Sequence, residues 1–287
     1  MYRPRCLVFG FSWVVLVMVG LWAWGALPAA ARDISWVELR PGMEFGFLSA
    51  GQSARSGSDR IACLRLDPIH LRFKVLAAPK GGTGHTARVW RIKSGALAVF
   101  NAGQYAADLS YLGLLVTGGK ARGRLAARLG ALFAAEPRDP TLPLARIIDL
   151  RYTPFPTAAN PYREAAQSLM LVDRFGAVRV RKSPKVAHRT LVAEDDQGRI
   201  MVMVTEGGHT LWELADFLKR HQLGLREIMC MDGGGESQID LKVGGFSYHQ
   251  YGDPAESPDF PLPWPRPPLP VVLAVFPRVG GVKTEVR

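Results

Sequence analysis

The sequence has few cysteines and lacks the short motifs of several common enzyme classes. Its 287 residues include three cysteines, which are too few for a disulfide scaffold. It contains no His-Glu-x-x-His, no Gly-x-Ser-x-Gly and no Gly-x-x-x-x-Gly-Lys-[Ser/Thr] sequence, and its six histidines are scattered. A histidine-based zinc site and a serine nucleophile are therefore not indicated. A glycine period and a sustained heptad are also missing, which excludes collagen-like and coiled-coil proteins.

The composition is that of a folded protein with a surplus of basic residues. Hydrophobic residues make up 48% of the chain and charged residues 21%, which excludes an intrinsically disordered protein and allows a sizeable core. Lys and Arg number 36 against 25 Asp and Glu, a formal net charge of +11. This surplus favours an anionic partner, such as nucleic acid, anionic lipid or a phosphate-bearing glycan, without choosing among them.

The first 31 residues are typical of an export signal. Arg3 and Arg5 precede an apolar run over residues 7–27, and the alanines at 29–31 provide an Ala-x-Ala cleavage site. The alternative is an uncleaved membrane anchor, because about 20 apolar residues are long enough to span a bilayer. Both alternatives place the rest of the chain in the periplasm or the extracellular space, with membrane contact only through residues 7–27. Cleavage near Ala31 leaves a net charge of 34 − 25 = +9.

Residues 33–287 predict one α+β domain that is rich in strands and has few helices. Helices are expected at 86–93 and at 210–223, the second with Leu211, Leu214 and Leu218 at helical spacing and Gly224 as its C-terminal cap. Residues 169–173 and 177–181 predict a hairpin around a turn at 174–176. Apolar runs bounded by Gly, Pro or Asp predict further strands at 61–66, 71–77, 96–100, 114–117, 200–204, 228–231 and 271–276.

Two features leave alternatives open. The proline-rich stretch 254–270 is either a polyproline ligand for a partner or an ordered surface loop, and we favour the loop because an apolar strand follows directly. Cys63 and Cys230 lie in apolar, strand-like stretches. They would be able to pair in an oxidising compartment, but two buried thiols fit these surroundings slightly better.

The sequence Asp232-Gly-Gly-Gly235 is the sharpest candidate for a functional site. It follows the apolar strand 228–231, so a buried strand delivers a carboxylate to its end, and the glycines let the backbone approach a ligand closely. Asp232 is placed to act as a base, a nucleophile or a metal ligand, and the N–H groups of Gly233, Gly234 and Gly235 are placed to bind an anion. The alternative is an Asp-Gly turn in which Asp232 caps its own backbone.

Two other strand ends carry polar residues. Asn101 and Gly103 follow the strand 96–100, where the amide offers a donor and an acceptor and the glycine allows close backbone approach. Glu206 follows the strand 200–204 and precedes two glycines, so we expect it to face the same cleft as Asp232. A polar turn that merely closes a strand is the alternative for Asn101.

Basic and capping residues complete the candidates. Thr210 and Glu213 form a capping box for the second helix, whose N-terminus would also favour an anion. Arg189 is suited to bidentate phosphate binding, with a surface ion pair as the alternative. The basic run at 120–128 is most simply a solvated face, and it lacks the aromatic residues that stack on bases, which argues against nucleic acid.

Taken in order, these segments resemble the signatures of the phosphodiester glycosidase family. Asn101-Ala-Gly103 before a Gly-Leu-Leu-Val strand resembles the first signature, and Arg189-Thr190 a central one. The helix start at Thr210, the apolar strand and Asp232-Gly-Gly-Gly235 resemble the last and most specific one. The resemblance spans residues from about 100 to about 240, and the strand 271–276 extends it.

The chain departs from the family pattern at a few positions. Glu236 stands where the family commonly has the first of two serines, and Ser237 keeps the second. Glu206 stands where many members carry Asp, and Tyr105 where Phe is usual. The two carboxylate departures bear on the choice of substrate more than on the activity.

The resemblance implies a hydrolase that cleaves the sugar–O bond of a sugar-1-phosphodiester in a phosphate-bearing glycan, with its cleft at the carboxyl ends of strands. Asp232 would be the nucleophile or water-activating base, Glu206 the second candidate, and Asn101 would orient the sugar or phosphate. Arg189 and the amides of 233–235 would clamp the departing phosphate. The implied cleft residues are Asn101, Gly103, Arg189, Glu206, Thr210, Asp232, Gly233, Gly234, Gly235 and Ser237.

No cofactor is expected, and no ligand cluster in the sequence indicates a divalent cation, although one near Asp232 is compatible with it. Two other functions stay open: a non-catalytic envelope glycan-binding protein, and a metal-dependent phosphodiesterase on the same scaffold.

Overall fold

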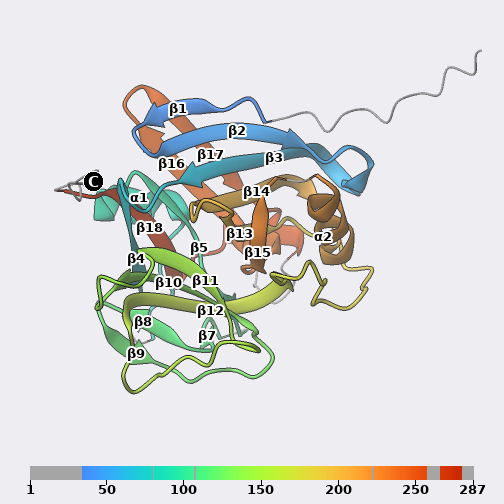
Figure 1. Cartoon of the computed structure of the whole chain (residues 1–287). Coiled ribbons are helices and arrows are strands. Elements are labelled where there is room, and N and C mark those ends of the chain that lie inside the picture. The colour runs from blue at the N-terminus through green and yellow to red at the C-terminus, as the bar shows by residue number, and fades with distance from the viewer. Residues whose placement is uncertain (1–33, 80, 107, 222, 257–265, 280–287) are drawn as a thin grey trace, which may run out of the picture. The chain divides into compact units, whose positions relative to one another are not determined.

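The computed structural model describes residues 34–79, 81–106, 108–221, 223–256 and 266–279 (Figure 1). The predicted export signal or anchor at 1–31, and residues 257–265 of the proline-rich stretch, lie outside the described residues. Among the helices of the described part, none is long and apolar enough to cross a membrane.

The larger of two sheets contains eleven strands within the described chain, and every pairing in it is antiparallel. Its main order is β1-β2-β3-β14-β13-β15-β12-β10-β11, with β8 joined to β12 and β9 to β8. The strands are β1 (Val37–Arg40), β2 (Met43–Ser49), β3 (Ser56–Leu66), β8 (Leu115–Thr117), β9 (Lys120–Arg122), β10 (Ala131–Pro137), β11 (Ala145–Asp149), β12 (Tyr162–Val172), β13 (Thr190–Asp195), β14 (Ile200–Gly208) and β15 (Leu225–Cys230).

The smaller sheet has the order β17-β16-β5-β18-β4 and is also antiparallel. Its strands are β4 (Leu71–Ala77), β5 (Ala98–Asn101), β16 (Gln238–Val243), β17 (Phe246–Tyr251) and β18 (Val271–Pro277). A separate two-stranded hairpin, β6 (Gln104–Tyr105) with β7 (Tyr111–Leu112), follows β5 directly.

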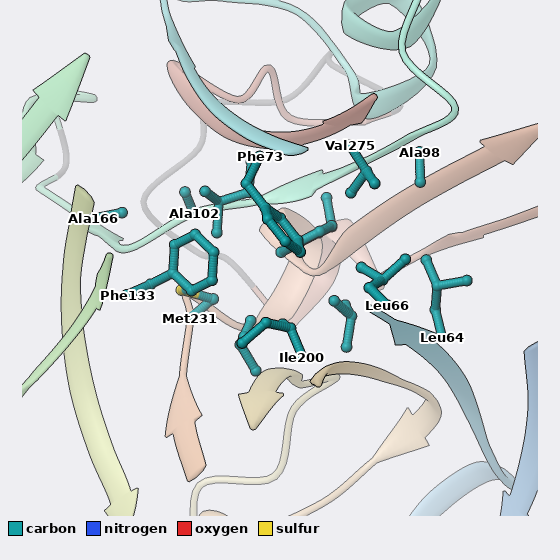
Figure 2. Close-up of a cluster of buried hydrophobic side chains, with 14 of the residues drawn as sticks. Leu64, Leu66, Phe73, Ala98, Ala102, Phe133, Ala166, Ile200, Met231 and Val275 are labelled. Atoms are coloured by element: carbon teal, nitrogen blue, oxygen red, sulfur yellow. The ribbon is translucent and has the colours of Figure 1, made fainter. Parts of the chain in front are cut away.

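Apolar side chains from both sheets meet in one core. Figure 2 shows Phe73 of the smaller sheet, Phe133 and Ile200 of the larger sheet, and Met231 within this cluster. All four are at most 1% exposed. Burying a large apolar side chain stabilises a fold by about 1.5–3 kcal/mol, so the residue before Asp232 is held firmly in place.

Two helices of the described chain lie on the outer faces of the sheets. α1 (Ala87–Ser94) packs Ala87 against Val99 and Val272 of the smaller sheet, and α2 (Leu211–Arg220) packs Leu214 and Leu218 on the larger sheet. Both predicted helices are thus confirmed, and the fold is the expected strand-rich α+β domain.

The second helix is shorter than predicted. It ends at Arg220. The ring nitrogen Nδ1 of His221 lies 2.9 Å from the carbonyl oxygen of Phe217, and so contacts one of the free carbonyl groups at the end of the helix. Gly224 has a positive φ of +68°, but it serves the turn into β15 and is not the cap of the helix.

The predicted hairpin at 169–181 is only half formed. The turn is present, because the Asp173 carboxylate accepts the N–H groups of Phe175 and Ala177. The returning segment makes an isolated bridge between Val178 and Val172 rather than a strand. Arg179 keeps one backbone hydrogen bond, to the carbonyl of Leu171 over 2.9 Å, and its side chain pairs with the carboxylates of Asp173 and Asp149.

The two cysteines are buried and free, as favoured from their surroundings, and the alternative of a disulfide is wrong. Cys63 lies on β3 and Cys230 on β15, and strands β14 and β13 separate them in the sheet. Burial raises the pKa of each thiol to about 12, so neither thiol is reactive near neutral pH.

Candidate active site

The site forms where the end of β15 in the larger sheet meets the end of β5 in the smaller one. The Asn101 amide nitrogen donates to the Asp232 carbonyl over 2.8 Å, and its amide oxygen accepts the N–H of Gln238 over 3.2 Å. Asn101 is fully buried. Both ends of its amide are therefore used on the backbone, and Asn101 positions Asp232 in this conformation.

Gly103 also holds the backbone of Asp232 in place. Its carbonyl accepts the Asp232 N–H, and its own N–H lies 3.2 Å from the sulfur of Met231. Its φ is +63°, and a Cβ at this position would overlap the Tyr111 ring. Only glycine fits this combination of backbone angle and close approach.

The Asp232 carboxylate is held by backbone N–H groups. One oxygen accepts from Gly233 over 3.0 Å and the other from Tyr105 over 3.2 Å. Burial, followed by the negative charge of Glu236, raises the pKa of Asp232 to about 7, against the lowering effect of these two hydrogen bonds. A carboxyl group that titrates near neutral pH is suited to proton transfer.

The carboxylate whose negative charge raises the pKa of Asp232 is Glu236. Glu236 is 5% exposed and lies in a 3-10 turn, η2 (Gly234–Glu236), that follows Asp232. Sequence reasoning treated Glu236 only as a departure from the family pattern, although it stands four residues after Asp232.

Glu206 makes its contacts elsewhere. Its carboxylate accepts from the Tyr248 hydroxyl over 2.9 Å and from the Ser58 hydroxyl over 3.3 Å, and lies 3.5 Å from Arg60. These partners come from β17 and β3, so Glu206 belongs to a polar group between those strands. No hydrogen bond joins it to Asp232 in the part of the chain that the structure covers.

Arg189 lies against the glycine turn. It is 7% exposed, with Nε donating to the carbonyl of His209 over 3.0 Å and Nη2 to that of Lys185 over 2.9 Å. A Cβ on Gly233 would come within 3.1 Å of Nη1, so this end of the guanidinium borders the turn. Across the described residues, no carboxylate lies within ion-pair distance of Arg189.

The glycine amides are partly used by the protein itself. The Gly233 N–H binds the Asp232 carboxylate, and the Gly234 N–H donates to the carbonyl of His188 over 3.0 Å. Gly234 also has a positive φ of +73°. In this conformation the N–H groups of Gly233 and Gly234, the first two of the expected anion site, are occupied by the protein itself.

Thr210 and Ser237 have structural partners. The Thr210 hydroxyl accepts the Glu213 N–H over 3.2 Å and donates to the Glu213 carboxylate over 2.7 Å, which is the predicted capping box. The Ser237 hydroxyl is fully buried and lies 2.9 Å from that of Thr190.

Two residues that sequence reasoning missed adjoin the turn. His188 precedes Arg189, and its ring nitrogen Nδ1 lies 2.9 Å from the Glu256 carboxylate. His188 was detectable, because it lies within the motif of Arg189. Glu256 was not, because it comes 68 residues later, in the proline-rich stretch.

A cavity of about 480 Å³ lies beside the β6–β7 hairpin. Tyr111, Arg122 and Val271 are among its lining residues. Tyr111 also borders Gly103, and the Tyr105 hydroxyl donates to the Val271 carbonyl. The cavity therefore adjoins the residues that hold Asp232. Within the described ranges, no group of three or more His, Cys, Asp or Glu side chains is arranged to hold a metal ion.

These observations define the class of protein. It is an α+β domain built on two main sheets, with an acidic glycine turn and a buried arginine at neighbouring strand ends. The family model of the phosphodiester glycosidases matches residues 94–273, well over half of the chain, and the protein belongs to this family. The resemblance seen in its motifs is thereby confirmed. No curated protein matches the chain.

Solved structures show the same fold at low sequence identity. The catalytic domain of zebrafish N-acetylglucosamine-1-phosphodiester alpha-N-acetylglucosaminidase, auto-inhibited by its pro-peptide, is similar with a TM-score of 0.54 and 17% identity, over 85% of this chain and 82% of that one. A Synechocystis protein is similar with a TM-score of 0.54 and 14% identity, over 87% of this chain and 65% of that one. Identities this low establish the fold alone.

Proposed function

We propose that this protein is an exported hydrolase that cleaves the sugar–O bond of a sugar-1-phosphodiester. The observation that carries the proposal is the juxtaposition of Asp232, whose pKa is raised to about 7, with the buried guanidinium of Arg189. A carboxylate and a cation at one turn suit a reaction in which water attacks a sugar and a phosphate departs.

Asp232 is the water-activating base in this proposal. Its two carboxylate oxygens are held by N–H groups of Gly233 and Tyr105, so the group is oriented before substrate binds. A base with a pKa near the working pH combines a useful deprotonated fraction with a strong drive to take the proton.

Arg189 binds the phosphate. Burying a charged group that has no direct ion pair is costly, and an anionic ligand at Nη1 would offset that cost. Nε and Nη2 are fixed on carbonyl oxygens, so the guanidinium is already oriented when the phosphate arrives. Burial lowers the pKa of Arg189, but an arginine stays charged in proteins.

The substrate is a phosphate-bearing glycan or a smaller sugar phosphodiester. The similar zebrafish enzyme is named for an N-acetylglucosamine-1-phosphodiester, which makes that class the first to test. The cavity of about 480 Å³ is in the range of small-molecule sites, roughly 300–1,000 Å³, and we assign the sugar to it. Export to the periplasm or the extracellular space follows from the composition of residues 1–31.

The test is product analysis on a panel of sugar-1-phosphodiesters in ¹⁸O-labelled water. Cleavage on the sugar side releases free sugar with the label on its anomeric oxygen, together with an unlabelled phosphate monoester. Asp232→Asn is expected to lower the rate at least about 100-fold, the usual size of a proton-transfer contribution. Glu206→Gln is the matched control and keeps the activity.

Other results would overturn the proposal. Label in the phosphate, with release of the sugar phosphate and loss of activity in chelator, would favour a metal-dependent phosphodiesterase. Tight binding of phosphoglycans with no turnover would favour a non-catalytic glycan-binding protein.

A further inference from the structure

His188 and Glu256 form a paired imidazole and carboxylate. One oxygen of Glu256 lies 2.7 Å from the His188 backbone nitrogen, whose N–H it accepts, and 2.9 Å from the ring nitrogen Nδ1. The two side chains are 14% and 16% exposed. A carboxylate that holds both the backbone and one ring nitrogen fixes the direction of the imidazole.

This pair adjoins the Asp232 turn. The His188 carbonyl accepts the Gly234 N–H over 3.0 Å. A Cβ on Gly252 would overlap the Gly234 carbonyl and would also lie 3.2 Å from the His188 Cβ, so these three segments meet with no space between them. The His188 imidazole is therefore attached to the same segment as Arg189, next to the Asp232 turn.

The chemistry of such a pair is proton transfer. When a carboxylate binds the Nδ1 side of an imidazole, the Nε2 side is left to exchange a proton with a ligand. Glu256 holds Nδ1, and no group among the described residues hydrogen-bonds Nε2. Imidazole changes charge between pH 5 and 8, and the second proton of a phosphate monoester is lost in the same range.

We propose that His188, oriented by Glu256, donates a proton to the departing phosphate oxygen. The proposal rests on the function proposed above and adds the acid that the Asp232 base lacks. Glu256 is a positioning residue, and His188 is the group that meets the substrate.

Water attacks the anomeric carbon and gives one proton to the Asp232 carboxylate. The sugar–O bond breaks, and its electron pair goes to the phosphate oxygen, which takes a proton from Nε2 of His188. Asp232 and His188 return to their starting protonation states by exchange with solvent, so the sum is one water consumed for one sugar and one phosphate monoester.

Several charged groups surround the pair. Glu256 binds the Nδ1 side of the imidazole, and the backbone nitrogen of Asp253 lies 3.5 Å from Nδ1. Arg189 follows His188 in the chain, and burial, together with the charges of Arg189 and His188, lowers the pKa of His209. These opposing charges make the pH profile the informative readout.

The experiment compares four forms of the protein on the sugar-1-phosphodiester that the wild type cleaves fastest. His188→Asn keeps an amide near the position of Nδ1, so it retains the contact with Glu256 but cannot transfer a proton. Glu256→Gln weakens the orientation alone, and His249→Gln, an exposed histidine on β17, is the matched control. Thermal unfolding of each variant checks that it is folded.

We expect His188→Asn to lower kcat about 100-fold with little change in KM. It should also abolish the alkaline limb of the plot of kcat against pH. Glu256→Gln should lower kcat by a smaller factor and displace the alkaline limb of the plot of kcat against pH. His249→Gln should show the same dependence of kcat on pH as the wild type. A folded His188→Asn variant with wild-type kcat and an unchanged limb would overturn the inference while leaving the proposed function intact. A wild type that cleaves nothing in the panel would overturn the proposed function itself, and this inference with it.

Discussion

The Asp232 carboxyl group is expected to make the folded protein less stable as the pH rises from about 4 to 7. Its pKa is raised from the usual value of 3.8 to about 7 in the folded state. The folded state therefore binds this proton more tightly than the unfolded state does. The resulting stabilisation is fully present below the unfolded pKa and is lost as the pH passes through the folded pKa.

The size of the effect follows from the shift. A difference of about 3 pKa units, at 1.36 kcal/mol each, corresponds to about 4 kcal/mol over the whole range. Roughly 2–3 kcal/mol of it falls between pH 5 and pH 8. Asp232→Asn removes the titration. It also leaves one of two backbone N–H groups facing an amide NH₂, which costs about 1–3 kcal/mol at every pH.

The assay is denaturant unfolding of the wild type and of Asp232→Asn between pH 4 and pH 8. Glu164, Glu194 and Glu227 also have pKa values raised by burial, but they titrate in both proteins and cancel in the difference. The wild type should lose its stability advantage steadily as the pH rises. A difference in unfolding free energy that stays constant across this range would refute the argument that burial and Glu236 perturb Asp232.

Three further substitutions test the site. Gly103→Ala should lower the free energy of unfolding by more than about 2 kcal/mol, because its φ is positive and the new Cβ meets the Tyr111 ring; an unchanged Tm would contradict this. Thr210→Ala should cost about 1 kcal/mol of stability through the lost helix cap while leaving kcat unchanged, and a loss of turnover without loss of Tm would instead indicate substrate contact. Glu206→Gln should keep its bond to Tyr248 and leave kcat/KM close to the wild-type value, so a large loss would restore Glu206 as a candidate base.

Much of the local structure was predictable because it depends on neighbouring residues. The capping box of Thr210 and Glu213, the apolar run at 228–231 and the turn at 174–176 all rest on contacts within a few residues. The end of α2 was misjudged, since a glycine near a helix terminus is a common cap but His221 performs that role here.

The partners of the site residues were not predictable in the same way. Glu206 and Asp232 both follow strands, yet the pleat and pairing of β14 place Glu206 beside Tyr248 of the other sheet. Asn101 was predicted to orient substrate, and the meeting of β5 and β15 engages its amide nitrogen and its amide oxygen with the backbone. The partners of these side chains depend on which strands are adjacent in the fold, and a local sequence pattern does not predict strand adjacency.

The sequence by itself determined the family, the two helices and the strand-rich α+β class, because these depend on short segments whose chemistry is local. Tertiary structure alone decided that the charge of Glu236 acts on Asp232, that Arg189 is buried, and that Glu256 reaches back to His188. The physical reason is that burial and distance set the pKa of a carboxyl and the cost of a buried cation, and both arise only when strands distant in sequence pack together.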